Sequence, residues 1–239
     1  MNHCPLSRSK ALITVMVTEL SLLRLLQLVS PGLPIGMYSY SQGMERAVDD
    51  GWIATASEAE EWMSGIMESC LTGIDLPILA RLYVAWNSDD EDSVCHWSRT
   101  LIAYRETAEL RAEDRQTGQA LARLLSDMGM PTMQAWIRKP ETTLATGFSF
   151  AAVNWGISND QAMLGYLWSW LENQVLCAVK LIPLGQVAGQ RLLADLAATI
   201  PGLVDKALQL SDIEIGGNAF SLALASSRHE MQYSRLFRS

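Results

Sequence analysis

The stretch that decides the fold is Ser158–Lys180, SNDQAMLGYLWSWLENQVLCAVK. Ser158 followed by Gln161 is a capping-box pattern, which predicts that a helix begins here. The apolar residues that follow fall on nearly every side of that helix: Met163, Leu164, Leu167, Trp168, Trp170, Leu171, Val175, Leu176 and Val179. A helix that is apolar all round is normally buried. We therefore expect a central helix that other helices surround.

Helical spacing of apolar residues continues on both sides of this stretch. It predicts further helices at 19–29, 44–50, 59–74, 78–86, 94–128, 142–155, 186–210 and 220–225. A capping-box pattern of Ser57 and Glu60 begins the third, Pro77 kinks or restarts the chain after it, and Pro201 interrupts the helix at 186–210. The helix that starts at Glu19 is rich in leucine, and we expect it to be buried.

The fold class expected from this pattern is all-α, a single-domain bundle of roughly eight to ten helices. The sequence has neither the alternating pattern of strands nor an internal repeat. A length of 239 residues suits one core. We divide the chain into an N-terminal extension over 1–17, expected to be disordered, a helical domain over 18–225 and a C-terminal tail over 226–239.

The composition narrows the class of protein. Hydrophobic residues make up 49% and charged residues 18%, which is typical of a packed globular chain. The net charge of −8 repels phosphate backbones, so we expect no nucleic acid partner. No apolar run reaches the roughly 18 to 20 residues of a membrane span. The four cysteines lack the spacing of a zinc site or a disulfide framework, which favours the reducing cytoplasm.

Residues suited to catalysis or to metal binding are sparse. The candidate ligands reduce to the adjacent pairs His3-Cys4, Cys95-His96 and His229-Glu230, and neighbours on a helix point roughly 100° apart. The chain has no GxSxG nucleophile elbow, no GxxxxGK[ST] phosphate loop and no GxGxxG turn after a strand. We therefore expect no enzymatic activity and no cofactor, and any nucleotide dependence belongs to a partner.

Three segments depart from a simple bundle pattern. Arg105–Arg115 is densely charged and partly in phase with a buried stripe, which fits a salt-bridged surface as well as an interface or a buried polar network. Glu172–Gln174 and Lys180 are polar residues in the most apolar helix; the first three need partners or water, and the lysine either snorkels or contacts another protein. The tail, Ser226–Ser239, mixes arginine with aromatic residues, which favours docking onto a partner over disorder.

These segments carry four ordered motifs that resemble the UreF family of urease accessory proteins. They are Pro34-x-Gly36-x-x-Ser39-x-Ser41-x-Gly43-x-Glu45, Arg105-Glu106-Thr-x-Glu109-x-Arg111, Lys180-x-x-Pro183-x-Gly185-Gln186 and His229-Glu-x-Gln-Tyr-Ser-Arg-Leu-Phe-Arg-Ser239. The likeness spans about Leu20 to Ser239. Met37 stands where a glycine or another small residue is expected, which affects only the local shape of the loop.

The resemblance implies an all-helical protein that assists nickel insertion into urease. Its partners would be the accessory protein UreD, also called UreH, the GTPase UreG and the urease apoprotein, and a homodimer is also implied. The tail from Arg228 to Arg235 would dock on UreD, while Ser39–Glu45 and Lys180–Gln186 would face UreG. The expected partner-binding residues are Pro34, Gly36, Ser39, Ser41, Gly43, Glu45, Arg105, Glu106, Glu109, Arg111, Lys180, Gly185, Gln186, Arg228, His229, Glu230, Gln232, Tyr233, Ser234 and Arg235.

Other readings remain open at this point. The chain either supplies an arginine to the GTPase active site or acts as a scaffold that couples the GTP state to metal transfer. Outside this family, it is a generic helical binding module unrelated to nickel. A further alternative is a helical enzyme that uses the carboxylates of Glu106, Glu109, Glu113 and Asp114 with a metal.

Overall fold

The computed structural model describes residues 19–239, and these form an all-α bundle. The described chain contains helices, turns and loops without a strand, so the predicted fold class is confirmed. The expected disordered extension over 1–17 lies outside the described residues. No helix in the described part is long and apolar enough to cross a membrane.

The helices follow one another with short connections. After a helix over residues 19–28, they are α2 (Met44–Asp49), α3 (Ala56–Ile66), a π-helix (Met67–Asp75), α4 (Leu76–Asn87), α5 (Glu91–Ala103), α6 (Ala108–Asp127), α7 (Leu144–Asn154), α8 (Asn159–Leu181), α9 (Gln186–Ala197), α10 (Ile200–Gln209) and α11 (Phe220–His229). Short 3-10 helices lie at Met37–Ser39, Pro131–Trp136 and Asp212–Glu214. Pro77 and Pro201 both stand in the first turn of a helix, where proline is tolerated.

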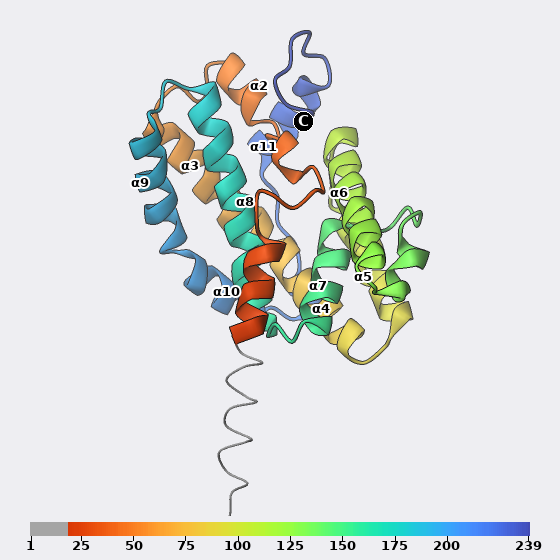
Figure 1. The fold of residues 1–239 in the computed structure, drawn as a ribbon. Helices are drawn as coiled ribbons and strands as arrows, with labels where there is room; N and C mark the ends of the chain where they lie inside the picture. The colour runs from red at the N-terminus through yellow and green to blue at the C-terminus, as the bar shows by residue number, and fades with distance from the viewer. Residues whose placement is uncertain (1–18) are drawn as a thin grey trace, which may run out of the picture.

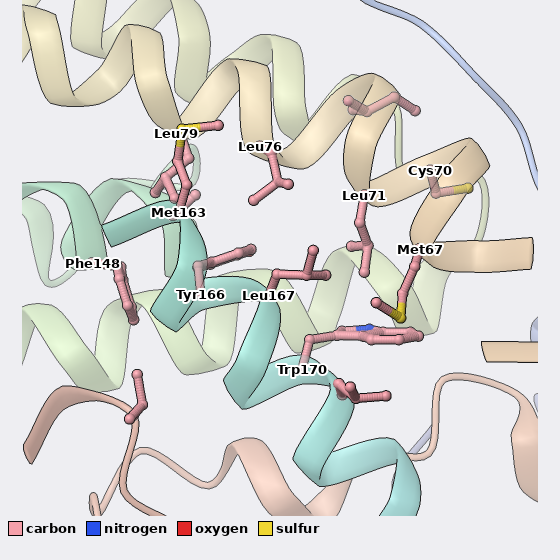
Figure 2. Close-up of a cluster of buried hydrophobic side chains, with 14 of the residues drawn as sticks. Met67, Cys70, Leu71, Leu76, Leu79, Phe148, Met163, Tyr166, Leu167 and Trp170 are labelled. Carbon is pink, nitrogen blue, oxygen red and sulfur yellow. The ribbon is translucent and has the colours of Figure 1, made fainter. Parts of the chain in front are cut away.

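Helix α8 is the centre of the bundle, as its sequence predicts. Its N-terminus carries the expected capping box of Ser158 and Gln161. It packs against α2, α4, α7, α9 and α10, which surround it in Figure 1. Figure 2 shows its residues Met163, Tyr166, Leu167 and Trp170 facing the π-helix and α4 across the core. Burial of these large apolar side chains makes α8 a substantial source of hydrophobic stabilisation.

The helix over residues 19–28 is not buried, contrary to the prediction. Leu20, Leu22, Leu23 and Leu26 are between 52% and 61% exposed. Only its other side packs inward: a Cβ on Gly165 of α8 would lie 2.6 Å from Leu25 Cδ1. The abundance of leucine correctly predicted a helix. It did not predict that, within residues 19–239, only one side of this helix is covered by the bundle.

Two local predictions are wrong in an informative way. The box that begins α3 uses Thr55 and Glu58, not Ser57 and Glu60, because an equivalent pattern two residues earlier starts the helix sooner. The helix expected over 94–128 is broken at 104–107, where the Thr107 side chain accepts a hydrogen bond from the Leu110 N–H and starts α6 anew. Arg105 therefore stands in a corner between two helices.

Candidate functional site

Four segments far apart in the sequence meet at one end of the bundle. In Figure 1 the C-terminus of the chain lies beside α2 and α11. The N-terminal turns of α6 lie at this same end of the molecule. The segment after α11 folds back onto a surface that we call the tail socket, made by Ser39, Ser41 and Glu45 of the early loop and α2 together with Glu109 and Glu113 of α6.

Glu45 is the anchor of the tail. Its carboxylate accepts hydrogen bonds from the backbone N–H groups of Leu236, at 2.7 Å, and Phe237, at 2.9 Å. His229 Nε2 lies 3.4 Å from the same carboxylate. Glu45 is itself buried, and such charge-assisted bonds are stronger than neutral ones. One side chain thus holds both α11 and the extended end of the tail.

Glu109 forms the second anchor. Its carboxylate lies 2.7 Å from His229 Nδ1, and its other oxygen accepts from Arg235 Nη1, also at 2.7 Å. Because His229 is fully buried between Glu45 and Glu109, its ring joins α2, α6 and α11. The predicted partner residues His229 and Arg235 therefore face this chain's own carboxylates.

The last residues lie along the early loop through backbone contacts. Arg238 N–H donates to the Ser39 carbonyl at 2.9 Å, and the Ser239 carbonyl accepts from the Ser41 N–H at 2.7 Å. The Ser41 hydroxyl donates to that carbonyl as well, at 2.6 Å. Ser239 is completely buried as a result.

Glu113 lies at the inner end of the socket. It accepts from Gln42 Nε2 at 2.8 Å and from Ser239 Oγ at 3.1 Å. Gln42 is in turn held by Trp170 of α8, whose indole N–H donates to Gln42 Oε1 at 2.7 Å. Burial, with a smaller contribution from the neighbouring Asp114, raises the pKa of Glu113 to about 7.

The motif at the end of α8 also reaches the tail. Lys180 Nζ lies over the buried ring of Phe237, 5.4 Å from its centroid. Gly185 and Gln186, at the start of α9, are exposed. Within α8, Asn173 donates to the Tyr40 carbonyl and Glu172 accepts from the Tyr38 hydroxyl. Glu172 and Asn173 therefore have the partners that the sequence analysis expected them to need. Gln174 is buried and has no hydrogen-bond partner in the structure.

Glycine permits the close approach of α11 to the early loop. Gly43 has φ +78°, and a Cβ there would lie 2.9 Å from the backbone N of Ser226. Gly36 also has a positive φ, +77°, but faces open space beside the exposed Pro34. In the early-loop motif, Gly43 is thus required by both packing and backbone conformation, whereas Gly36 is required by backbone conformation alone.

Arg105 takes part in a buried polar network, one of the readings left open by the sequence. Its Nε lies 2.8 Å from Asp114 and its Nη1 lies 3.1 Å from Asp75 of the π-helix. Burial by itself lowers the pKa of Arg105. The carboxylates of Asp75 and Asp114 outweigh this effect, so the pKa lies well above its usual value. These groups line a cavity of about 60 Å³ between the π-helix, α6 and α8. The next residue, Glu106, is exposed, and Arg111 donates to the Arg105 carbonyl.

The outward side of the tail is apolar. Met231, Tyr233 and Leu236 are 87%, 105% and 64% exposed. Among the charged residues nearby, Arg228 pairs with Asp50 and Glu230 caps the Ala108 N–H of α6. Gln232 and Ser234 contact each other within the turn between α11 and the extended end. The expected partner-binding residues of the tail did not include Met231, Leu236 or the inward Phe237, although the mixture of arginine with aromatic and apolar residues in the tail was a signal for them.

The four carboxylates considered for a metal-dependent enzyme do not form one group of metal ligands, although Glu106, Glu113 and Asp114 line the same cavity. Glu109 and Glu113 hold different parts of the tail, Asp114 pairs with Arg105 and accepts from the Leu144 N–H, and Glu106 points to solvent. Within residues 19–239 no group of three or more potential metal ligands is found.

Comparison with known proteins gives one consistent result. The model of the UreF family matches residues 53–197. A urease accessory protein UreF from Alkalilimnicola ehrlichii is 50% identical over 216 residues, which are 90% of this chain and 95% of that protein. The one from Pseudomonas putida strain W619 is 49% identical over 94% of this chain and all of its own length, and the one from Azoarcus sp. strain BH72 is 48% identical over 92% and 96%.

Proposed function

Because this chain belongs to the UreF family of urease accessory proteins and so has a role in urease maturation, we propose that it is a non-catalytic scaffold joining UreD to the GTPase UreG during nickel insertion. In this role it couples GTP hydrolysis to the loading of the urease apoprotein. The observation that carries the proposal is the convergence of the four family motifs on one end of the bundle, where they fix the tail in a defined conformation.

The UreD-binding surface is the outward side of the tail. Met231, Tyr233 and Leu236 are exposed apolar side chains on a segment that is rigidly anchored from beneath, which lowers the entropic cost of binding. Arg228 and Arg235 are already paired within the chain, so they orient the tail and are not the main contacts. The matching surface on UreD is therefore expected to be an apolar groove.

The arrangement of charges favours a scaffold over a supplier of a catalytic arginine. Arg105 is only 18% exposed and is paired with Asp75 and Asp114, and Arg228 and Arg235 are held in ion pairs, so none of these three is presented freely to a GTPase. The exposed Arg238 is the natural test. In single-turnover hydrolysis by UreG we expect Arg238→Ala to act like the unmodified chain; a strong acceleration abolished by this change would contradict the scaffold.

Complementation tests the proposal as a whole. A urease operon that lacks its own UreF gene is supplied with this chain and nickel, and urease activity is measured together with UreD co-purification. Tyr233→Asp and Leu236→Asp should lower both, since each places a charge in an apolar contact. Ile213→Asp is the matched control, because Ile213 is 95% exposed on a different loop. Full activity and UreD binding by both tail variants would overturn the assigned surface.

A second copy of the chain is a further proposed partner. Within residues 19–239, the exposed leucines of the helix over 19–28 form an apolar stripe on the side of that helix that does not pack on α8. Burying such a stripe against its own copy is favourable because it removes apolar area from water on both sides.

A further inference from the structure

Among the described residues, Glu113 differs from Glu45 and Glu109 of the tail socket in having neither a lysine or arginine nor a histidine as a direct partner. Its two hydrogen-bond donors, Gln42 Nε2 and Ser239 Oγ, are neutral. Glu109, by contrast, is paired with Arg235 and contacts His229. A buried carboxylate without a paired cation is costly, and the usual response is to keep its proton.

The surroundings of Glu113 add little positive charge. Arg105 lies nearby, but its guanidinium is engaged by Asp75 and Asp114. The titratable and charged groups around Glu113 are Asp114 on its own helix, Arg105 from the preceding corner, Asp75 from the π-helix, Tyr166 and Cys177 from α8, and Glu45 and Lys180, which also act electrostatically on the Cys177 thiol. Acidic groups outnumber basic ones in this set.

The tail is what keeps water away from the outer side of Glu113. Ser239 is completely buried and Phe237 is 6% exposed, and both are held by the backbone bonds to Ser41 and Glu45. When these residues leave the socket, Glu113 gains access to solvent and loses the Ser239 contact. Docking of the tail and protonation of Glu113 are therefore linked, because each changes the free energy of the other.

We propose that the tail is held in its socket by a proton on Glu113: the tail docks firmly while this carboxyl is neutral and loosens when it ionises. The neutral carboxyl can donate its proton to Ser239 Oγ, since a serine hydroxyl serves equally as acceptor. The ionised form places an unpaired negative charge beneath the tail. This inference concerns the tail's own equilibrium and stands whether or not the tail binds UreD.

The direction of the pH dependence follows from the two states. With the tail docked, the pKa of Glu113 is raised from 4.5 to about 7, chiefly by burial. With the tail released, the carboxyl is solvated and its pKa returns toward the ordinary value, so the docked form binds the proton more tightly. Docking is thus strongest at low pH and weakens by up to about tenfold per pH unit as the pH rises between these values, then levels off above about pH 7.

Fluorine NMR of the full chain measures the docked fraction directly. One of the four phenylalanines is Phe237, and in protein labelled with 4-fluorophenylalanine its resonance is assigned by Phe237→Leu. We expect a single docked resonance near pH 5.5 and a growing released population as the pH approaches 7. In Glu113→Gln, which keeps the shape but cannot ionise, the docked fraction should not change with pH. The proposal would be overturned if the docked fraction of the unmodified chain did not change with pH. It would also be overturned if the docked fraction of Glu113→Gln still changed with pH, and His229 would then be the group to test.

The reverse measurement needs no change at Glu113. The titration of its side-chain carboxyl is followed by carbon NMR in the unmodified chain and in Phe237→Ser, which weakens docking by removing a buried ring. Linkage requires the pKa of Glu113 to fall toward its ordinary value in this variant. The same titration in Phe220→Ser serves as control, since Phe220 is 76% exposed and outside the socket. An unchanged Glu113 titration in Phe237→Ser would contradict the linkage.

Discussion

At the residue scale, a few side chains hold segments that are nearly two hundred positions apart. Glu45 contacts His229, Leu236 and Phe237, and it does so from within a buried site. Buried charges are retained only where hydrogen bonds compensate for lost hydration. The glutamate of the early-loop motif is therefore explained by the structure as an internal anchor of the tail, while Met231, Tyr233 and Leu236 of the tail are exposed.

Glu45→Gln should release the end of the tail. The amide keeps one acceptor oxygen but presents an NH₂ group to a backbone N–H, so about 1.5 to 3 kcal/mol of the free energy of unfolding should be lost. Urea denaturation measures the loss, and hydrogen exchange at Leu236 and Phe237 should accelerate. Glu60→Gln, at an exposed position of α3, is the control. Equal unfolding midpoints for the two variants would refute the anchoring role.

Comparing Gly43→Ala with Gly51→Ala separates the cost of backbone strain from the cost of a steric clash. Both glycines have positive φ, +78° and +76°, but a Cβ at position 43 would meet Ser226 whereas position 51 is open. We expect Gly51→Ala to cost about 1 kcal/mol from strain alone and Gly43→Ala to cost clearly more. Thermal unfolding of both decides the matter: if the two lose the same stability, the contact with Ser226 is not tight.

At the element scale, the corner between α5 and α6 and the π-helix before α4 share one polar network. The loop after α10 crosses the π-helix closely, where the Gly216 N–H donates to the Gly73 carbonyl at 3.0 Å. The π-helix widens the turn and brings Asp75 to Arg105. These two irregular elements therefore determine where α6, and with it the tail socket, is placed.

Gly217→Ala tests the crossing. A Cβ at position 217 would lie 2.0 Å from the Ser69 carbonyl oxygen of the π-helix, so the loop must move and the chain should lose stability. Gly202→Ala in α10 meets nothing within 4 Å and should stabilise by about 0.5 to 1 kcal/mol, as alanine favours a helix. Chemical denaturation should give opposite signs for the two variants. A Gly217→Ala protein as stable as the original would show that the loop is not packed as described.

Arg105→Met tests the buried network. The substitution leaves Asp75 and Asp114 buried without their cation, and breaking such a pair from one side costs about 3 to 5 kcal/mol. The control is Arg123, which is exposed on α6. Arg123→Met should change the free energy of unfolding by less than about 0.5 kcal/mol. If urea unfolding shows only a small difference between the two, Arg105 is not a structural residue and its role as a partner contact regains support.

At the scale of the whole molecule, residues 19–239 leave one side of the helix over 19–28 exposed. Leu22→Glu with Leu26→Glu should abolish self-association, measured by sedimentation velocity, without lowering the unfolding midpoint, because both side chains are more than half exposed. Leu25→Glu is the contrasting variant and should destabilise the fold, since that leucine packs on Gly165. A double variant that self-associates like the original would exclude this surface as the contact between copies.

The fold class, the central helix and most helix positions follow from the amino-acid sequence, because helical periodicity and capping residues are local properties. The apolar residues on nearly every side of Ser158–Lys180 predict a buried helix, and the family motifs mark segments that contact one another in the structure. Tertiary structure alone decided which side of each motif faces inward. Glu45, His229 and Arg235 read as partner contacts in sequence, yet they hold the tail, because a pairing between α2, α6 and residues 229–239 depends on long-range geometry that local patterns do not encode.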